Sequence, residues 1–229
     1  MTVRTFLLIA LLAFVSGLGG SLPSTAGWGV YAYREGAFVP VSTDQQYRLP
    51  SASSPAPATC ALADLPASWQ IRGARYADLT ADGAPECVFL VWRPWADWPI
   101  MRWSDAPSPI ADHRDAGGDS AHIILIEPLS AEPAQRRGRS YHKVWAGSAL
   151  AAPVVQMAVG DVNGDGRNEL IVLEGDYATG RDGPAYQMAV WRWNGFGFTL
   201  AWRSRLDTPL TGLAVIDLNG DGAAEILVR

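Results

Sequence analysis

The sequence predicts an all-β protein built from a repeated unit of strands. Three observations lead to this prediction. Short apolar runs alternate with turns rich in Gly and Pro, the acidic turn DVNGDGRNEL at 161–170 returns as DLNGDGAAEI at 217–226, and hairpins rich in aromatic residues lie between such turns. With 229 residues, 48% of them hydrophobic and 18% charged, the chain suffices for one large β domain or two small ones. The net charge of -5 argues against nucleic acid as a partner.

The acidic turn has a third copy, DLTADGAPEC, at 78–87. Every copy follows a strand-like run (71–77, 154–160 and 210–216) and precedes another (87–92, 170–175 and 226–229). The pattern indicates a strand, an acidic turn and a second strand, three times over.

Hairpins rich in aromatic residues complete the unit. The segments 28–42 and 188–202 share alternating aromatic and β-branched residues around a Gly-containing turn, and 122–128 with 141–148 forms a looser version. Pairing each acidic hairpin with an aromatic one gives about three units of four strands. The aromatic hairpin missing after 217–226 is the one at 28–42, so we expect the N-terminal hairpin to complete the last sheet and to close a ring without open edges.

The N-terminal residues resemble an export signal. Arg4 precedes an apolar run at 6–18 and a small-residue stretch, so we expect residues 1–26 to be a signal peptide and 27–229 to be an extracytoplasmic domain, secreted, periplasmic or at the cell surface. An uncleaved membrane anchor is the alternative. In an oxidising compartment Cys60 and Cys87 are candidates for a disulfide, with two free buried thiols as the alternative.

Two segments interrupt the strand pattern. Residues 43–67 are rich in Pro and Ser and read as a surface linker, and residues 93–119 form an insertion rich in Trp and Pro. Candidate acid–base residues of the insertion are Asp112, His113 and Asp115. Candidate aromatic binding residues in and beside it are Trp92, Trp95, Trp98 and Trp103.

The three Asp-x-Asn/Thr-x-Asp-Gly-x-x-Glu turns between strands resemble the FG-GAP/VCBS-type repeats of integrin-like β-propellers. The resemblance implies four-stranded blades around an axis, calcium in the acidic loops, and an exported binding or adhesion role. Three blades are fewer than propellers usually have. The expectation is therefore either a tightly closed ring of three blades or a homodimer of two half-rings.

The acidic turns offer oxygen ligands at alternate positions, as a calcium loop requires. An EF-hand is excluded because its twelfth position needs Glu, whereas Phe89, Val172 and Val228 stand there, between strands. A tight turn without metal is the alternative. In the first copy Thr80, a weaker ligand, replaces Asn. The candidate calcium ligands are Asp78, Thr80, Asp82 and Glu86; Asp161, Asn163, Asp165, the Arg167 carbonyl and Glu169; and Asp217, Asn219, Asp221, the Ala223 carbonyl and Glu225.

The sequence therefore favours an exported, calcium-stabilised binding or adhesion module for a protein or carbohydrate partner, without chemistry of its own. An enzyme or enzyme accessory with its site in the 93–119 insertion is one alternative, and a structural subunit of an extracytoplasmic complex is another. Contact with a membrane is expected only if the N-terminal segment stays uncleaved.

Overall fold

The computed structural model describes residues 28–42, 58–62, 64–95, 113–129 and 140–229. The predicted signal peptide, most of the 43–67 linker and the centre of the 93–119 insertion lie outside the described residues. The described part is all-β, as predicted, with two short 3-10 turns, η1 (Ala58–Cys60) and η4 (Tyr177–Thr179). Its strands are β1 (Gly29–Arg34), β2 (Ala37–Val41), β3 (Gln70–Ala77), β4 (Glu86–Pro94), β5 (Asp119–Pro128), β6 (Tyr141–Ala146), β7 (Val154–Gly160), β8 (Glu169–Glu174), β9 (Ala185–Trp193), β10 (Phe198–Leu210), β11 (Leu213–Ile216) and β12 (Glu225–Val228).

These strands form three four-stranded antiparallel sheets, which confirms the predicted unit. The first sheet has the order β3-β4-β5-β6, the second β7-β8-β9-β10 and the third β11-β12-β1-β2. Each sheet joins one acidic hairpin to one aromatic hairpin. Strands lie on either side of each acidic turn, as the sequence predicts, but the run predicted at 210–216 is divided: Leu210 ends β10 and β11 begins at Leu213.

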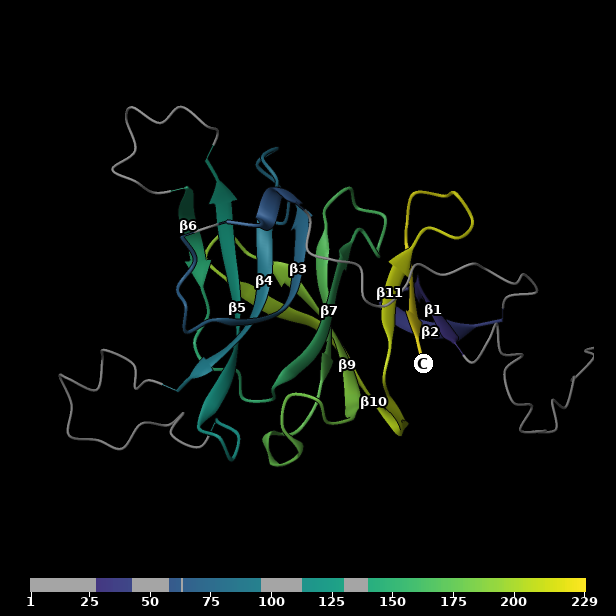
Figure 1. Ribbon diagram of the computed structural model, residues 1–229. Coiled ribbons are helices and arrows are strands. Elements are labelled where there is room, and N and C mark those ends of the chain that lie inside the picture. Colours follow the sequence, from purple (N-terminus) through teal and green to yellow (C-terminus); the bar gives the residue numbers. More distant parts are fainter. Residues whose placement is uncertain (1–27, 43–57, 63, 96–112, 130–139) are drawn as a thin grey trace, which may run out of the picture.

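The N-terminal hairpin completes the third sheet. β1 runs antiparallel to β12, with Gly29 opposite Val228 and Tyr31 opposite Ile226, so the two ends of the described chain lie side by side (Figure 1). This pairing covers the edge of β12 that would otherwise expose unpaired backbone groups. The predicted completion of the last sheet by the N-terminal hairpin is therefore confirmed.

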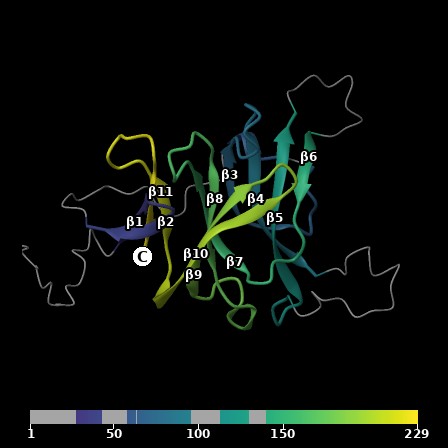
Figure 2. The ribbon, with the colours of Figure 1, turned by 180° about the vertical axis from the view of Figure 1, so that it is seen from behind.

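The sheets stand side by side, with the second in the middle (Figures 1 and 2). β7 contacts β3 of the first sheet and β11 of the third, so these strands line the junction of the three sheets. Closure of the sheets into a ring stays a prediction.

Strand β8 of the middle sheet is buried on both faces, which explains its uninterrupted apolar run. Successive side chains of a strand point to opposite faces. On β8, Leu170 and Val172 pack toward the first sheet, whereas Ile171 and Leu173 pack toward the third. All four side chains are completely buried.

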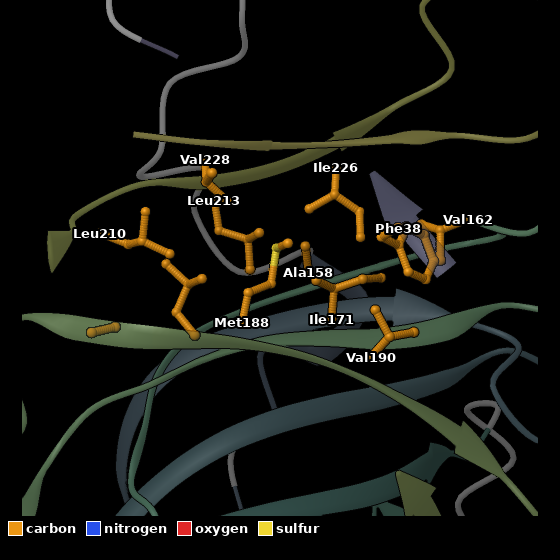
Figure 3. Packing of buried hydrophobic residues seen from close by; sticks show 12 residues of the cluster. Phe38, Ala158, Val162, Ile171, Met188, Val190, Leu210, Leu213, Ile226 and Val228 are labelled. Carbon is orange, nitrogen blue, oxygen red and sulfur yellow. The ribbon is translucent and has the colours of Figure 1, made fainter. Parts of the chain in front are cut away.

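The core between the second and third sheets is made by interdigitating aliphatic side chains. Figure 3 shows Ile226 and Val228 of β12 facing Ile171 and Met188 of the second sheet, with Phe38 of β2 beside them. Phe38 also meets the Trp202 ring edge-on, with 5.3 Å between ring centroids. The N-terminal hairpin thus contributes to the core as well as to the sheet.

The outer face of the first sheet is covered by the segment 58–69, described apart from residue 63. Leu62, Leu65 and Trp69 pack there against the β4 and β5 residues that point away from the second sheet. A disulfide joins Cys60 of this segment to Cys87 of β4, with the two Cα atoms 5.6 Å apart. We call residues 58–69 the cap segment.

The disulfide is expected to stabilise the first sheet. It links positions 27 residues apart, and closing a loop of this length contributes about 2–4 kcal/mol to the free energy of unfolding. A Cys60→Ala/Cys87→Ala variant should lose this amount in urea-induced unfolding. Reductant should lower the stability of the wild type and leave the variant unchanged; equal effects on the two would contradict the assignment.

Candidate metal centres

The three acidic loops follow β3, β7 and β11 and lie at the same end of the sheets, as Figure 1 shows for the loops after β7 and β11. We call them the first (78–86), second (161–169) and third (217–225) loops. Hydrogen bonds connect them across the sheets. Asn168 Nδ2 donates to the Asp78 carbonyl over 2.9 Å, and the Ala224 N–H donates to the Asp161 carbonyl over 2.7 Å. The loops therefore form one continuous row.

The first aspartate of each loop organises the turn by accepting backbone N–H groups. Asp161 Oδ1 accepts from the Gly164 nitrogen at 2.7 Å, and its Oδ2 accepts from the Gly166 nitrogen at 2.8 Å. Asp78 and Asp217 accept backbone N–H groups of their own loops in the same manner. Such bonds fix the orientation of the carboxylate and gather oxygen atoms at one point.

The ninth residue of each loop is a buried glutamate that closes the turn, and both of its oxygens accept hydrogen bonds. One oxygen accepts a backbone N–H from the second position of the loop, and the other accepts from the side chain at the third position. Glu86 accepts from Leu79 N (2.9 Å) and Thr80 Oγ1 (2.6 Å). Glu169 accepts from Val162 N (3.2 Å) and Asn163 Nδ2 (2.7 Å). Glu225 accepts from Leu218 N (2.8 Å) and Asn219 Nδ2 (3.0 Å).

The first loop brings three carboxylates together. Asp78, Asp82 and Glu86 offer oxygen atoms that all lie within 4.8 Å of one another. A calcium ion binds its ligands at roughly 2.3–2.6 Å, so oxygens separated by up to twice that distance can share one ion. The donor set of this loop therefore fits a hard divalent cation. Thr80 contributes a single hydroxyl here, where the other loops carry an amide group.

In the second loop a cation of the chain itself reaches two of the predicted ligands. Arg192 Nε donates to Glu169 Oε1 over 3.3 Å, and Arg192 Nη2 lies 3.5 Å from Asp165 Oδ2. Burial raises the pKa of Glu169, and the Val162 N–H and Arg192 act in the opposite direction. Sequence reasoning missed Arg192, although its position on β9 opposite Glu169 follows from the strand pairing.

In the third loop an amide group lies between two predicted ligands. Asn219 Nδ2 donates to both Asp221 Oδ2 and Glu225 Oε1, each over 3.0 Å. To bind a cation, this amide would have to turn its oxygen inward. The same holds for Asn163 in the second loop.

The candidates in and beside the 93–119 insertion are arranged differently. Asp115 accepts hydrogen bonds from Arg181 over 3.0 Å and from the Asp119 N–H over 2.9 Å, so it fastens two loops together. Trp92 is completely buried, with the Arg181 guanidinium 5.1 Å from its ring centroid, and is part of the core. Asp112, Trp98 and Trp103 lie outside the described residues.

The fourth position of each loop has a left-handed backbone. Gly164 and Gly220 adopt φ values of 74° and 77°, but the first loop has Ala81 at 59°. A side chain in this conformation costs about 1–2 kcal/mol, whereas Gly adopts it freely.

Ala81→Gly should therefore stabilise the protein by up to about 1 kcal/mol, and Gly220→Ala should destabilise it by about 1 kcal/mol. Thermal unfolding in excess chelator measures the effect of the backbone alone. Changes of the same sign in the two variants would contradict the assigned conformations.

Comparison with known proteins identifies the repeated unit. Residues 161–228 match the family model of the FG-GAP-like repeat, a range that begins at the first aspartate of the second loop and ends with β12. No curated protein matches the chain. Within the described residues, no helix has the length and apolar character needed to cross a membrane. The VCBS part of the sequence resemblance stays a prediction, and the match identifies an FG-GAP-like repeat within residues 161–228 of the chain.

Proposed function

We propose that this protein is an exported module of the β-propeller type, stabilised by calcium, that binds a protein or carbohydrate partner. The observation that carries the proposal is the convergence of Asp78, Asp82 and Glu86 in the first loop of a chain that contains an FG-GAP-like repeat. Carboxylate oxygens at this spacing favour a hard cation. Extracellular fluids supply calcium, and such repeats are typical of extracellular proteins.

Calcium would neutralise the negative charge that each loop concentrates on one turn. In the first loop, Asp78, Asp82 and Glu86 would hold the ion in the arrangement that they already have. In the second and third loops, the asparagine amides would have to present their oxygens. The first loop is therefore the one best prepared for the ion.

The position of the loops explains how an ion would stabilise more than one hairpin. Asn168 of the second loop binds the carbonyl of Asp78, and Ala224 of the third loop binds the carbonyl of Asp161. An ion that orders one loop therefore also orders an acceptor used by the next sheet. We infer a structural role for calcium, with partner binding left to other surfaces.

Binding is favoured over catalysis because two acidic groups in the described part of the insertion, Asp115 and Asp119, are already engaged. Asp115 and Asp119 both bind Arg181, at 3.0 Å and 2.6 Å, and are largely buried. Burial acts to raise the pKa of Asp115, but the hydrogen bonds that it accepts from the Asp119 N–H and from Arg181 outweigh its burial and lower its pKa, so this carboxylate is a poor proton acceptor. Export agrees with the Cys60–Cys87 disulfide, since such bonds persist in oxidising compartments.

Calcium should raise the melting temperature of the wild type. A ligand present at about 100 times its dissociation constant stabilises the folded state by about 2.7 kcal/mol per site. Asp82→Asn should reduce this shift, because the change removes a ligand charge while Oδ1 can still accept the Ala84 N–H. Asp207→Asn, an exposed acid of β10 outside the loops, is the matched control and should respond like the wild type.

The calcium part of the proposal is wrong if the melting temperature of the wild type is the same in calcium, in magnesium and in chelator. For partner binding, the immobilised domain should capture a protein or glycan from the extracytoplasmic fraction in calcium and release it in chelator. If the domain captures the partner equally well in calcium and in chelator, calcium stabilises the fold but is not needed for partner binding.

A further inference from the structure

We propose that Arg192 is a built-in counter-ion of the second loop, competing with calcium for Asp165 and Glu169. The middle sheet would then keep its loop folded without calcium, while the first and third loops depend on the ion. This inference rests on the calcium binding proposed above. It separates the calcium requirement of the second loop from that of the first and third, although the three loops look alike in sequence.

The contacts of Arg192 carry the first step. Its Nε lies 3.3 Å from Glu169 Oε1, and its Nη2 lies 3.5 Å from Asp165 Oδ2, so one guanidinium bridges the fifth and ninth positions of the loop. Both of these residues are predicted calcium ligands. A bound ion and the guanidinium would require the same oxygens, so they compete.

Comparison of the three sheets shows that this cation is particular to the second. Leu170 lies opposite Trp191, so the next pair along these antiparallel strands is Glu169 and Arg192. By the same continuation of the register, Glu86 of the first sheet meets Glu127, and Glu225 of the third meets Ala32. Among the described residues, no Lys or Arg forms an ion pair with the acidic side chains of the first or third loop.

Burial explains why the loop needs a cation. The Glu169 side chain is 0% exposed, and an ionised carboxylate at such a position is costly unless it is paired. The Arg192 side chain is 45% exposed, so it can turn into solvent when an ion arrives. Arg192 therefore supports the empty loop and weakens calcium binding to it.

Calcium titration by calorimetry tests the competition. Asp82→Asn and Asp221→Asn weaken the first and third loops and leave the second for measurement. In this background Arg192→Gln should tighten calcium binding roughly two- to fivefold, because a competing ion pair of this exposure is lost. The same change should lower the melting temperature in chelator. Arg192→Lys, which keeps the charge, should bind calcium nearly as the background does.

Arg203→Gln is the matched control. Arg203 Nη2 lies 2.8 Å from Glu174 Oε1, another buried carboxylate of β8, but this pair is not part of the acidic loop. Its loss should lower the melting temperature without changing the calcium dissociation constant. The control thus separates a general loss of stability from competition at the loop.

An unchanged or weaker calcium affinity in Arg192→Gln would overturn the inference. If the wild type still shows its calcium-dependent melting temperature in that case, the proposed function survives. If neither the wild type nor Arg192→Gln binds calcium, the inference and the calcium part of the proposed function are both wrong.

Discussion

The buried glutamate at the end of each acidic loop is the interaction on which the rest of the structure depends. Glu86, Glu169 and Glu225 begin β4, β8 and β12, and each accepts the N–H of the second loop residue while lying at the edge of the core. Each glutamate therefore fixes where one strand ends and where the next begins. The register of the hairpin, and with it the division of side chains between two faces, follows from that point.

The fold was largely predictable because its signals are local and repeated. Three acidic turns with apolar runs on both sides define three hairpins, and the match between 28–42 and 188–202 shows which terminal segment completes the last sheet. The chain order alone is enough to pair β1 with β12. Alternation did not reveal how the apolar runs divide, since residues 87–92 of β4 and 170–173 of β8 are buried on both faces and are apolar throughout.

The candidate sites were predictable in composition but not in arrangement. The ligand-type residues can be read from the repeated turn, whereas the role of Arg192 depends on which residue β9 places opposite Glu169. That neighbour comes from a distant part of the chain and has no motif. The convergence of Asp78, Asp82 and Glu86 in the first loop, with oxygen atoms within 4.8 Å of one another, likewise depends on how the loop folds and has no separate signal in the sequence.

The cap segment limits how many sheets can stack in the row. It occupies the outer face of the first sheet, and the Cys60–Cys87 bond fastens it there. Any additional sheet, from this chain or from a second copy, would have to displace the cap segment before it could stack at that end. The segment therefore covers this end of the row of sheets, much as a capping repeat covers the end of a solenoid.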